Sequence, residues 1–511
     1  MALSKICGAI LITAFIYLGF RILQRRSSSL PLPPGPTLIS MSTPDRDIWR
    51  TFGEWHMKYG PIVSLRLGFQ TVIILGNRKI AQDLLEKRSI IYSSRPKSIL
   101  IDKYLCKGLQ PAFMQYDTVC RLHRRLDTFL LSTRASQAYK RIHDLESKQL
   151  TYELLSERDF YKPLHRYTSS AMFTLVYGKA LTDPHHDIQE IQILDDWVEY
   201  AIKGLSIGSF MVDAFPIIDR FPRFLTRWKS SVENVHRKAN LAFKQCYNAG
   251  IQEEGWNWSR EILQRKDTKE LSHERLASYM GGLYLAGSHS THLSLESFVI
   301  TCLLHPNAVK KVQRELDCVI GLQRLPSFED TDKLPQVNAF INEVMRWRPA
   351  APLGFPHSAS EDNEYMGYLI PANSIVITNQ WQMNMDENTF NDPELFQPER
   401  WIKNLDLPLS SFGFGRRACP GQQVARSTLF IAVSRLLWAY NILCPEVDQH
   451  KKEQAANSSG DQGAAFRPSR FNACFEIRSP EHRDAIEREW ASANKDRSQI
   501  LADIGDQIFG S

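Results

Sequence analysis

The amino-acid sequence predicts a mainly α-helical protein with small β-sheets, preceded by one N-terminal transmembrane helix. Three observations carry this prediction. Apolar residues recur with a helical period through most of residues 79–350. Runs rich in β-branched residues over 62–75, and shorter ones within 351–380, are typical of strands. Residues 6–20 form an uncharged, mostly apolar run, close to the ~18 residues that indicate a membrane-spanning helix.

The N-terminal apolar run is predicted to be an uncleaved anchor. No small-residue cleavage site of the signal-peptide kind follows it. Arg21, Arg25 and Arg26 follow the run and outnumber Lys5 before it, so the positive-inside rule places the rest of the chain in the cytoplasm. The prolines within 31–36 indicate a stiff, extended spacer after the anchor.

Composition excludes several classes of protein. The 511 residues are 43% hydrophobic and 23% charged, which is ordinary for a globular protein with a large core. The net charge of +6 is mild, and no basic run interleaved with aromatic residues indicates binding to nucleic acid. The nine cysteines include no Cys-x-x-Cys pair, which argues against a zinc site or a dithiol redox centre. An odd, unpatterned set suits a reducing compartment, and all except Cys419 are expected to fill the core.

The strands and helices are expected in a definite order. Residues 62–68 and 71–75 are predicted to pair through a turn at 68–70, because Gly68 interrupts the two apolar runs. Residues 205–221 are apolar and at best amphipathic, and they are interpreted as core or, by the resemblance described below, as a lid that dips into the membrane.

The longest predicted helix spans Ser272 to Leu304. Ser272 can cap its start, and Pro306 disfavours helix at the residue before it. A helix of ~33 residues is about 50 Å long, enough to cross the whole domain. Residues 449–465 are polar and are predicted to form a solvated loop, and the charged stretch from about 485 is predicted to be peripheral.

The most informative segment is Phe412–Gly421, which places Cys419 in a glycine-rich turn before an apolar helical stretch. The glycines permit backbone conformations that are closed to other residues. Backbone N–H groups and the neighbouring Arg416 and Arg417 are expected to favour the thiolate, the form of cysteine that binds metals. The alternative is a free cysteine in a tight turn.

The pattern Phe-x-x-Gly-x-Arg-x-Cys-x-Gly resembles the haem-binding loop of cytochrome P450 monooxygenases. The resemblance implies the cytochrome P450 fold, in which one mostly helical domain takes up nearly the whole chain. It also implies haem b as cofactor, with Cys419 as the axial metal ligand. A thiolate ligand favours cleavage of the O–O bond. Arg417 would pair with a haem propionate, and Phe412 would pack near the sulfur and shield it from water.

Two further segments resemble parts of the family that contact haem. Residues 116–125 resemble the helix that carries Trp-Arg-x-x-Arg, with Cys120 where Trp is usual and with Arg124 in place. By resemblance Arg124 touches the propionates, and one propionate hydrogen bond is lost or replaced by water at Cys120. His357 is a further candidate propionate donor. The alternative for residues 116–125 is a solvated basic helix.

A structural support for the haem loop is also implied. Glu343 and Arg346 lie three residues apart on a predicted helix and so share a face. Residues 396–401 resemble the family's Pro-Glu-Arg-Phe segment, with Trp401 for Phe. The resemblance implies that Glu343, Arg346 and Arg400 form a buried, mutually hydrogen-bonded triad.

The helix expected beside dioxygen departs from the family pattern. Residues 286–291 read Ala-Gly-Ser-His-Ser-Thr, where the family usually has Ala-Gly-x-acid-Thr-Thr. By resemblance Gly287 lets the helix bulge to admit dioxygen, and the hydroxyl of Ser290 donates toward the distal oxygen. His289 replaces the usual acid and, because histidine titrates near neutrality, could relay protons. The alternative is that His289 faces outward as a satisfied polar residue.

The resemblance divides the chain into a membrane anchor at 1–30, a proline-rich hinge at 31–36 and a haem-thiolate monooxygenase domain at 37–511. It implies an enzyme that inserts one oxygen atom from O2 into an apolar organic substrate, with electrons from NADPH delivered by NADPH–cytochrome P450 reductase. A single-pass anchor in the endoplasmic reticulum membrane would hold the catalytic domain in the cytosol. Basic residues near the proximal face could steer the acidic reductase: Arg121, Arg124, Arg125 and Arg416.

The substrate is not implied beyond an apolar pocket, for which Leu283, Leu353, Phe355 and residues 100–113 are candidates. Residues 347–401 resemble filamentous-fungal members of secondary metabolism. The departure at His289 and Ser290 keeps a second function open, a haem-thiolate peroxide isomerase or a haem sensor that does not oxygenate.

Overall fold

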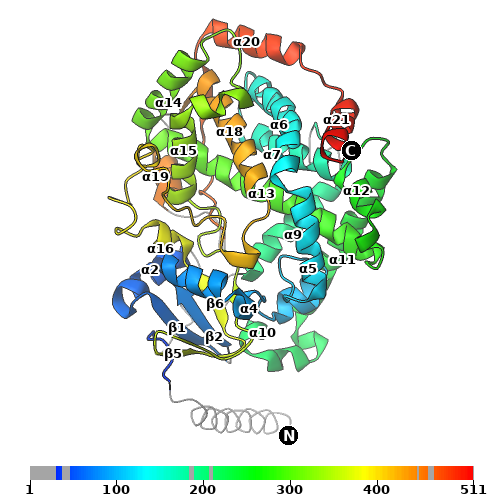
Figure 1. Cartoon of the computed structure of the whole chain (residues 1–511), viewed down its shortest axis with the longest axis vertical. Coiled ribbons are helices and arrows are strands. Elements are labelled where there is room, and N and C mark those ends of the chain that lie inside the picture. The colour runs from blue at the N-terminus through cyan, green and yellow to red at the C-terminus, as the bar shows by residue number, and fades with distance from the viewer. Residues whose placement is uncertain are drawn as a thin grey trace.

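Helices make up most of the protein, and a small sheet lies at one end of the molecule (Figure 1). The computed structural model describes residues 30–36, 47–68, 70–182, 189–205, 211–445, 448–457 and 465–509. The prediction of a mainly α protein with small sheets is confirmed. Within those ranges, no helix is both long and apolar enough to cross a lipid bilayer. The predicted anchor at 1–30 lies, apart from Leu30, outside the described residues.

The α-helices are α2 (Ile48–Tyr59), α3 (Arg78–Ala81), α4 (Ser89–Tyr92), α5 (Thr118–Leu130), α6 (Thr133–Glu153), α7 (Tyr161–Tyr177), α9 (Gln189–Leu205), α10 (Met211–Ala214), α11 (Arg227–Gln252), α12 (Trp258–Gln264), α13 (His273–Leu304), α14 (Pro306–Val319), α15 (Pro335–Trp347), α16 (Gln380–Asn384), α17 (Arg400–Lys403), α18 (Gln422–Ala439), α19 (Gln449–Asn457), α20 (Pro480–Ala491) and α21 (Arg497–Phe509). Two π-helical segments are η1 (Gln82–Lys87) and η2 (Ile99–Cys106), and the 3-10 turns are η3 (Pro216–Arg220), η4 (Arg223–Leu225), η5 (Lys266–Thr268), η6 (Phe328–Lys333) and η7 (Gly415–Arg417).

The main sheet has four strands in the order β1-β2-β6-β3. Its strands are β1 (Ile62–Leu67), β2 (Gln70–Leu75), β6 (Ile375–Thr378) and β3 (His357–Ser358). β1 and β2 are antiparallel, with Ile62 opposite Leu75 at one end and Leu67 opposite Gln70 at the other. The turn between them is the one that the sequence predicted, and Gly68 adopts φ +57° in it. Two hairpins complete the β structure: β4 (Asn363–Tyr365) with β5 (Tyr368–Ile370), and β7 (Tyr440–Leu443) with β8 (Cys474–Ile477).

The proline-rich segment 31–36 lies against the sheet region. The backbone N–H of Ser64 donates to Pro34 O at 3.0 Å, and that of Leu369 donates to Pro31 O at 2.8 Å. These bonds tie the segment to β1 and to β5. The segment therefore leaves the protein from a fixed position, instead of acting as a free spacer.

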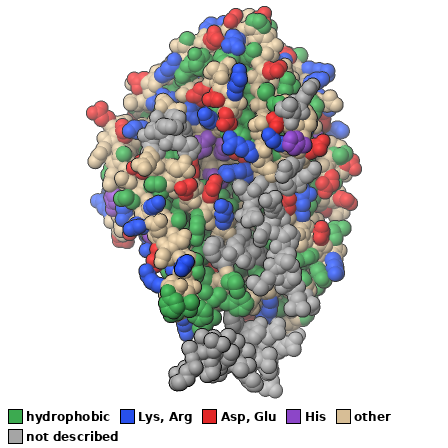
Figure 2. All heavy atoms as spheres, turned by 180° about the vertical axis from the view of Figure 1, so that it is seen from behind, with side chains coloured by type: hydrophobic (Ala, Val, Ile, Leu, Met, Phe, Trp, Pro, Cys, Tyr) green, Lys and Arg blue, Asp and Glu red, His purple; other side chains and the backbone are tan. Residues whose placement is uncertain are grey.

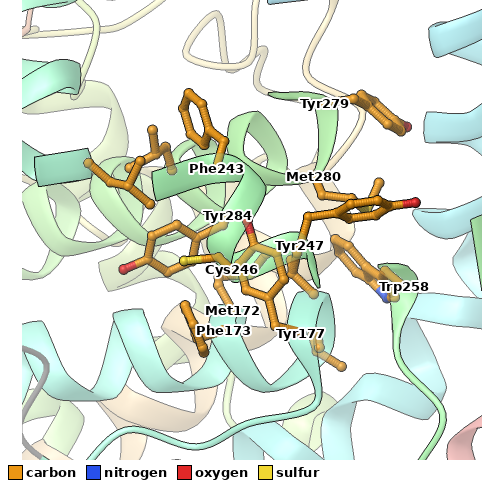
Figure 3. Close-up of a cluster of buried hydrophobic side chains, with 14 of the residues drawn as sticks. Met172, Phe173, Tyr177, Phe243, Cys246, Tyr247, Trp258, Tyr279, Met280 and Tyr284 are labelled. Carbon is orange, nitrogen blue, oxygen red and sulfur yellow. The ribbon is translucent and has the colours of Figure 1, made fainter. Parts of the chain in front are cut away.

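The helix α13 crosses the centre of the molecule and confirms the prediction of a long helix after Ser272. The Ser272 hydroxyl oxygen accepts from the Arg275 backbone N–H at 3.2 Å, and Pro306 begins the next helix. Tyr284 of α13 packs against Phe173 and Tyr177 of α7 (Figure 3), and Tyr279 stacks on His123 of α5. This packing holds α13 rigidly between its neighbours.

Two predictions about the C-terminal region are wrong. Residues 449–457 were predicted to be part of a solvated loop, but they form α19, and Ala455 is fully buried in the core. Residues 458–464 of the predicted loop lie outside the described residues. The stretch after 485 is not peripheral, because Leu501 and Ile504 on α21 are fully buried in the largest apolar cluster. An apolar helix face gains stability by packing on the core, and the surrounding charges concealed that face in the sequence.

The cysteines are free, as expected, in the part of the chain that the structure describes. Four of them are buried in helical segments and fill the core: Cys106, Cys120, Cys246 and Cys302. The prediction of core filler is wrong for Cys318 and Cys474, which are exposed, and Cys444 is only partly buried. Cys7 lies outside the described residues.

Candidate active site

The turn that carries Cys419 is held by its own backbone and by a close contact with η1. The Cys419 N–H donates to Phe412 O at 2.8 Å, and the Ala418 N–H donates to Gly415 O at 3.1 Å. Gly415 adopts φ +61°, and a Cβ there would lie 2.0 Å from Leu85 O. No other residue fits at position 415, so the glycine fixes the path of the chain into η7 and then α18.

The Cys419 side chain can be reached by solvent, yet the surrounding protein encloses it. Burial raises the pKa of its thiol, although a hydrogen bond from the Gly421 backbone and the charge of Arg124 act in the opposite direction. The backbone donor thus favours the thiolate as expected, but burial outweighs it. A bound metal ion would supply the missing stabilisation, because a coordinated thiol loses its proton.

Two arginines, the buried Arg95 and the partly buried Arg417, lie beside this turn and bind backbone carbonyls. Arg417 donates to Ser93 O at 2.8 Å and to Pro111 O at 3.1 Å. Arg95, which the sequence analysis missed, donates through Nε to Ala112 O at 2.9 Å and through Nη1 to two further carbonyls. Burial, and then the charge of Arg417, lower the pKa of Arg95 to about 9.

Arg124 connects α5 to the cysteine turn. Its Nη2 donates to Ala418 O at 3.1 Å, and its Nη1 lies 3.4 Å from Asp127 Oδ2. Burial raises the pKa of Asp127 to about 6, against the opposing charge of Arg124. Cys120, where the family has Trp, is fully buried, and burial raises the pKa of its thiol. The cysteine is therefore a neutral, weak donor.

His357 lies on β3 and is neutral in the structure. Its Nδ1 is 2.8 Å from Tyr92 O, so Nδ1 carries the proton and Nε2 has a free lone pair. Burial, then the charge of Arg95, lower the pKa of His357 to about 3. In this tautomer Nε2 has no proton to donate, so a bond to a propionate requires the imidazole to be protonated. Its predicted role as a propionate donor stays a prediction.

The donor set fits haem. Three guanidinium groups (Arg95, Arg124 and Arg417) interact electrostatically, and the carboxyl nearest to them, Asp127, has a raised pKa. Among the described residues, Arg95 and Arg417 hydrogen-bond only to backbone carbonyls, and such cations favour an anionic partner, which the two carboxylates of a haem supply. The solvent-accessible thiol of Cys419 stands next to this cluster, since Arg124 binds the residue before it. Phe412 is partly buried, with the Arg426 guanidinium over its ring at 5.3 Å, and its predicted role as a shield stays a prediction.

The helix α13 presents Ala286 and Ser290 as exposed residues, one turn apart. The Ser290 hydroxyl donates to Ala286 O at 2.7 Å. Gly287 lies against α7, where a Cβ would come 2.6 Å from Met172 Cε. α13 is helical through this position, and the bulge that Gly287 was predicted to allow stays a prediction. Gly287 also leaves room for the Met172 side chain of α7.

His289 is less basic than the sequence suggested. Burial is the main cause that lowers its pKa to about 3, and the charges of Arg467 and His292 act in the same direction. It therefore carries no charge between pH 6 and 9 and does not titrate near neutrality. It is partly exposed and forms no hydrogen bond with any residue that the structure describes, and both interpretations of its role stay predictions.

The predicted triad of Glu343, Arg346 and Arg400 is present and buried. Arg346 binds both oxygens of the Glu343 carboxylate at 2.8 and 2.9 Å, and Arg400 Nε lies 3.1 Å from Glu343 Oε1. The indole N–H of Trp401 donates to Glu343 Oε2 at 2.8 Å, a contact that the usual Phe could not make. The Ser411 hydroxyl, donating to Met345 O at 2.8 Å, connects this helix to the cysteine turn.

Comparison with known proteins decides the family. The family model for cytochrome P450 matches residues 30–475. The chain belongs to the cytochrome P450 family. It is 39% identical to cytochrome P450 monooxygenase aneD of Aspergillus aculeatus over 99% of both chains, and 39% identical to cytochrome P450 monooxygenase FrzL of Cladobotryum sp over 94% of both. The predicted haem-thiolate monooxygenase is thereby confirmed as the enzyme class.

A solved structure shows the same fold. A zebrafish cytochrome P450 determined with abiraterone superposes with a TM-score of 0.69 at 24% identity, over 84% of this chain and 100% of that one. The predicted cytochrome P450 fold is confirmed.

Three residues of this P450 escaped the sequence analysis: Arg95, Trp401 as a donor, and Tyr116. The ring of Tyr116 lies 5.5 Å from the Arg417 guanidinium and 5.6 Å from that of Arg416. Tyr116 and Arg95 stand in irregular segments, where no period indicates which way a side chain points. No local pattern marked Arg95, because the stretch around it (Ser93, Ser94, Lys97 and Ser98) is polar.

Proposed function

We propose that this P450 inserts one oxygen atom from O2 into an apolar organic substrate, with electrons from NADPH passed on by a reductase. The observation that carries the substrate class is a pocket of about 120 Å³ beside Arg95. Its walls are mostly apolar and come from the sheet, η2 and α9: Leu67, Val72, Ile101, Phe113, Phe355 and Ile377. Phe355 and residues 100–113 were predicted as pocket candidates, whereas Leu353 is buried in a core cluster and Leu283 packs against another.

The haem iron, when bound, supplies the binding and activation of O2. Cys419 would hold the iron, and Arg95, Arg124 and Arg417 would balance the two propionates. Ser290 would hold a proton at its hydroxyl. The similarity to monooxygenases of Aspergillus and Cladobotryum supports a role in fungal secondary metabolism.

The reductase proposal is supported by exposed arginines at the cysteine turn. Arg121 and Arg416 are exposed, and both guanidinium groups lie over the ring of Tyr116, at 6.0 and 5.6 Å. Such a basic surface attracts an acidic redox partner. The test is reconstitution: NADPH consumption and oxygenated product should require the reductase and the substrate together. Peroxide conversion without any reductase would favour the isomerase instead.

Replacing Ser290 with alanine is expected to divert electrons from product to hydrogen peroxide. The hydroxyl is the donor that α13 presents on its exposed face, and general acid assistance is typically worth ~10²–10⁴ in rate. Ordered water recovers part of this, so we expect product per NADPH to fall by about tenfold or more. Peroxide and product are measured against NADPH, with substrate affinity followed by the spin-state shift.

The control for this variant is Ser294→Ala. Ser294 lies one turn further along α13 and its hydroxyl donates to Ser290 O at 2.9 Å, but it is outside the Ala-Gly-Ser-His-Ser-Thr motif. The Ser294→Ala variant should form as much product per NADPH as the natural protein. Unchanged coupling in Ser290→Ala would show that this hydroxyl does not deliver protons, and the sensor or isomerase function would then be preferred.

Membrane attachment in the endoplasmic reticulum is a further part of the proposal. Hydrophobic side chains gather at the end of the molecule where α10 lies in Figure 1 (Figure 2). The segment 211–225 exposes six of them: Met211, Phe215, Ile217, Phe221, Phe224 and Leu225. An exposed apolar patch of this kind fits a lipid surface.

Deleting residues 1–30 is expected to release most of the protein from membranes while haem binding is retained. The described domain begins its contacts at the proline segment, so the deletion removes none of the haem-site residues. Flotation with vesicles and the carbon monoxide difference spectrum measure the two properties. Residual binding should disappear when Phe224→Ser and Leu225→Ser are added, and a truncated protein that folds without haem would contradict the division into domains.

A further inference from the structure

A polar funnel of about 270 Å³ lies between α7, α9 and α13. Its outer rim is formed by exposed residues of α9, including Asp196 and Glu199. Its inner wall is formed by the histidines His165, His289 and His292. The function proposed above assigns no role to any of these three histidines.

The histidines of the funnel have different partners. His165 Nε2 lies 3.2 Å from Asp195 Oδ2, a bond that orients the ring. His292 Nε2 lies 2.8 Å from Glu296 Oε1, and Glu296 Oε2 in turn lies 3.7 Å from Arg467 Nε. The rings of His165 and His292 meet edge to face, with centroids 5.5 Å apart. His292 therefore belongs to a buried ion-pair network, whereas His165 is held by a residue on the funnel wall.

His289 has no such partner among the residues that the structure describes, and it lines the funnel. The charged and titratable groups that affect the pKa of His289 are Arg467, His292 on the same helix, Asp195 on α9 and His165 on α7. Its ring is neutral at physiological pH. A neutral imidazole has one nitrogen that accepts a proton and one that donates, so it can pass a proton on without gaining charge.

The position of His289 on α13 joins the funnel to the oxygen side. With 3.6 residues per turn, its side chain is about 60° around the helix from Ala286 and about 100° from Ser290. Ala286 and Ser290 form the exposed face described above. His289 therefore stands at the border between the face that lines the funnel and the face that carries the Ser290 hydroxyl.

We propose that this funnel is the route by which solvent protons reach Ser290, with His165, oriented by Asp195, as the positioning residue that connects solvent to His289. His289 accepts a proton at one ring nitrogen and releases the proton of the other, so charge is conserved. Water returns the ring to its first tautomer. This inference rests on the proposed monooxygenase function and assigns its proton supply to α7 and α9, not to an acid on α13.

The test compares His165→Gln and Asp195→Asn with Asp196→Asn. Asp196 is the next residue of α9, lines the same funnel and bonds with Gln192 instead of a histidine, so it is a matched control. We expect product per NADPH to fall by about tenfold in the first two variants. This loss is smaller than the usual rate effect of a general acid, because water can bypass the ring. The control should keep its coupling. Substrate affinity, from the spin-state shift, should not change in any of them.

A second measurement does not depend on turnover. Histidine ¹⁵N resonances are recorded in the reduced, carbon monoxide-bound holoenzyme from pH 6 to 9. The His289 ring should stay neutral across this range, and Asp195→Asn should shift the tautomer signals of His165. A His289 ring that titrates between pH 6 and 9 would overturn the neutral relay.

The outcomes separate this inference from the function on which it rests. Loss of the thiolate-type carbon monoxide band in the natural protein would contradict the proposed function itself. A normal band and normal product, with His165→Gln and Asp195→Asn both coupled as the natural enzyme, would overturn the funnel route alone. Quantifying the band in every variant also shows that each one has folded.

Discussion

Cys419→Ala is expected to abolish both the thiolate-type carbon monoxide band and product formation. Cys419 is the cysteine of the glycine-rich turn, and Arg124 binds the carbonyl of the residue before it. Cys106, Cys120 and Cys302 are buried inside helical segments and cannot reach the same position. Without sulfur the iron loses the ligand that favours O–O cleavage. The carbon monoxide difference spectrum and the amount of bound haem are the measurements.

Two controls make this prediction sharp. Cys474→Ala removes an exposed thiol on β8 and should keep the full band. Haem content separates loss of the ligand from loss of the haem. A Cys419→Ala protein that keeps a thiolate-type band would show that another cysteine holds the iron.

Glu343→Gln is expected to destabilise the domain by about 3–5 kcal/mol, the usual cost of leaving a buried charge without its partner. The Glu343 carboxylate accepts bonds from Arg346, Arg400 and Trp401, and both Glu343 and Arg346 are fully buried. A neutral amide cannot balance the guanidinium of Arg346. The unfolding temperature, recorded at one scan rate, and the yield of haem-loaded protein should both fall.

An exposed ion pair provides the contrast. Lys87 Nζ lies 2.7 Å from Asp83 Oδ1, and the Lys87 side chain is 74% exposed. Lys87→Ala should cost only ~0.2–1 kcal/mol, because solvent screens such a pair. Equal losses in the two variants would mean that the Glu343 cluster contributes no more than a surface pair.

The sequence was sufficient for the elements that follow from local chemistry. Ser272 and Pro306 predicted the limits of α13 to within one residue, because a capping hydroxyl and a ring without an N–H act within one turn. Gly68 predicted the turn of the first hairpin for a similar reason. The triad at Glu343 was predicted from a family pattern, and the extra bond from Trp401 was not, because it depends on how two distant segments meet.

The rest depends on long-range packing. The pKa of His289 follows from burial between α7, α9 and Arg467, so its position in the sequence suggested the wrong charge. The contact of Gly287 with Met172 could not be predicted for the same reason, because Met172 lies on another helix. Arg95 was missed because its partners are carbonyls, and a carbonyl is present at every residue.

The C-terminal helices show that a family match is not the limit of the folding unit. The match ends at residue 475, in the middle of β8, and leaves α20 and α21 outside it. Yet Arg497 Nη2 lies 3.0 Å from the fully buried carboxylate of Glu146, in a network that also includes Arg166. A chain shortened at the edge of the match would lose half of strand β8 and one of the cations that neutralise this buried acid. The last thirty or so residues are a component of the catalytic domain's interior, and any tag or fusion is best joined beyond α21.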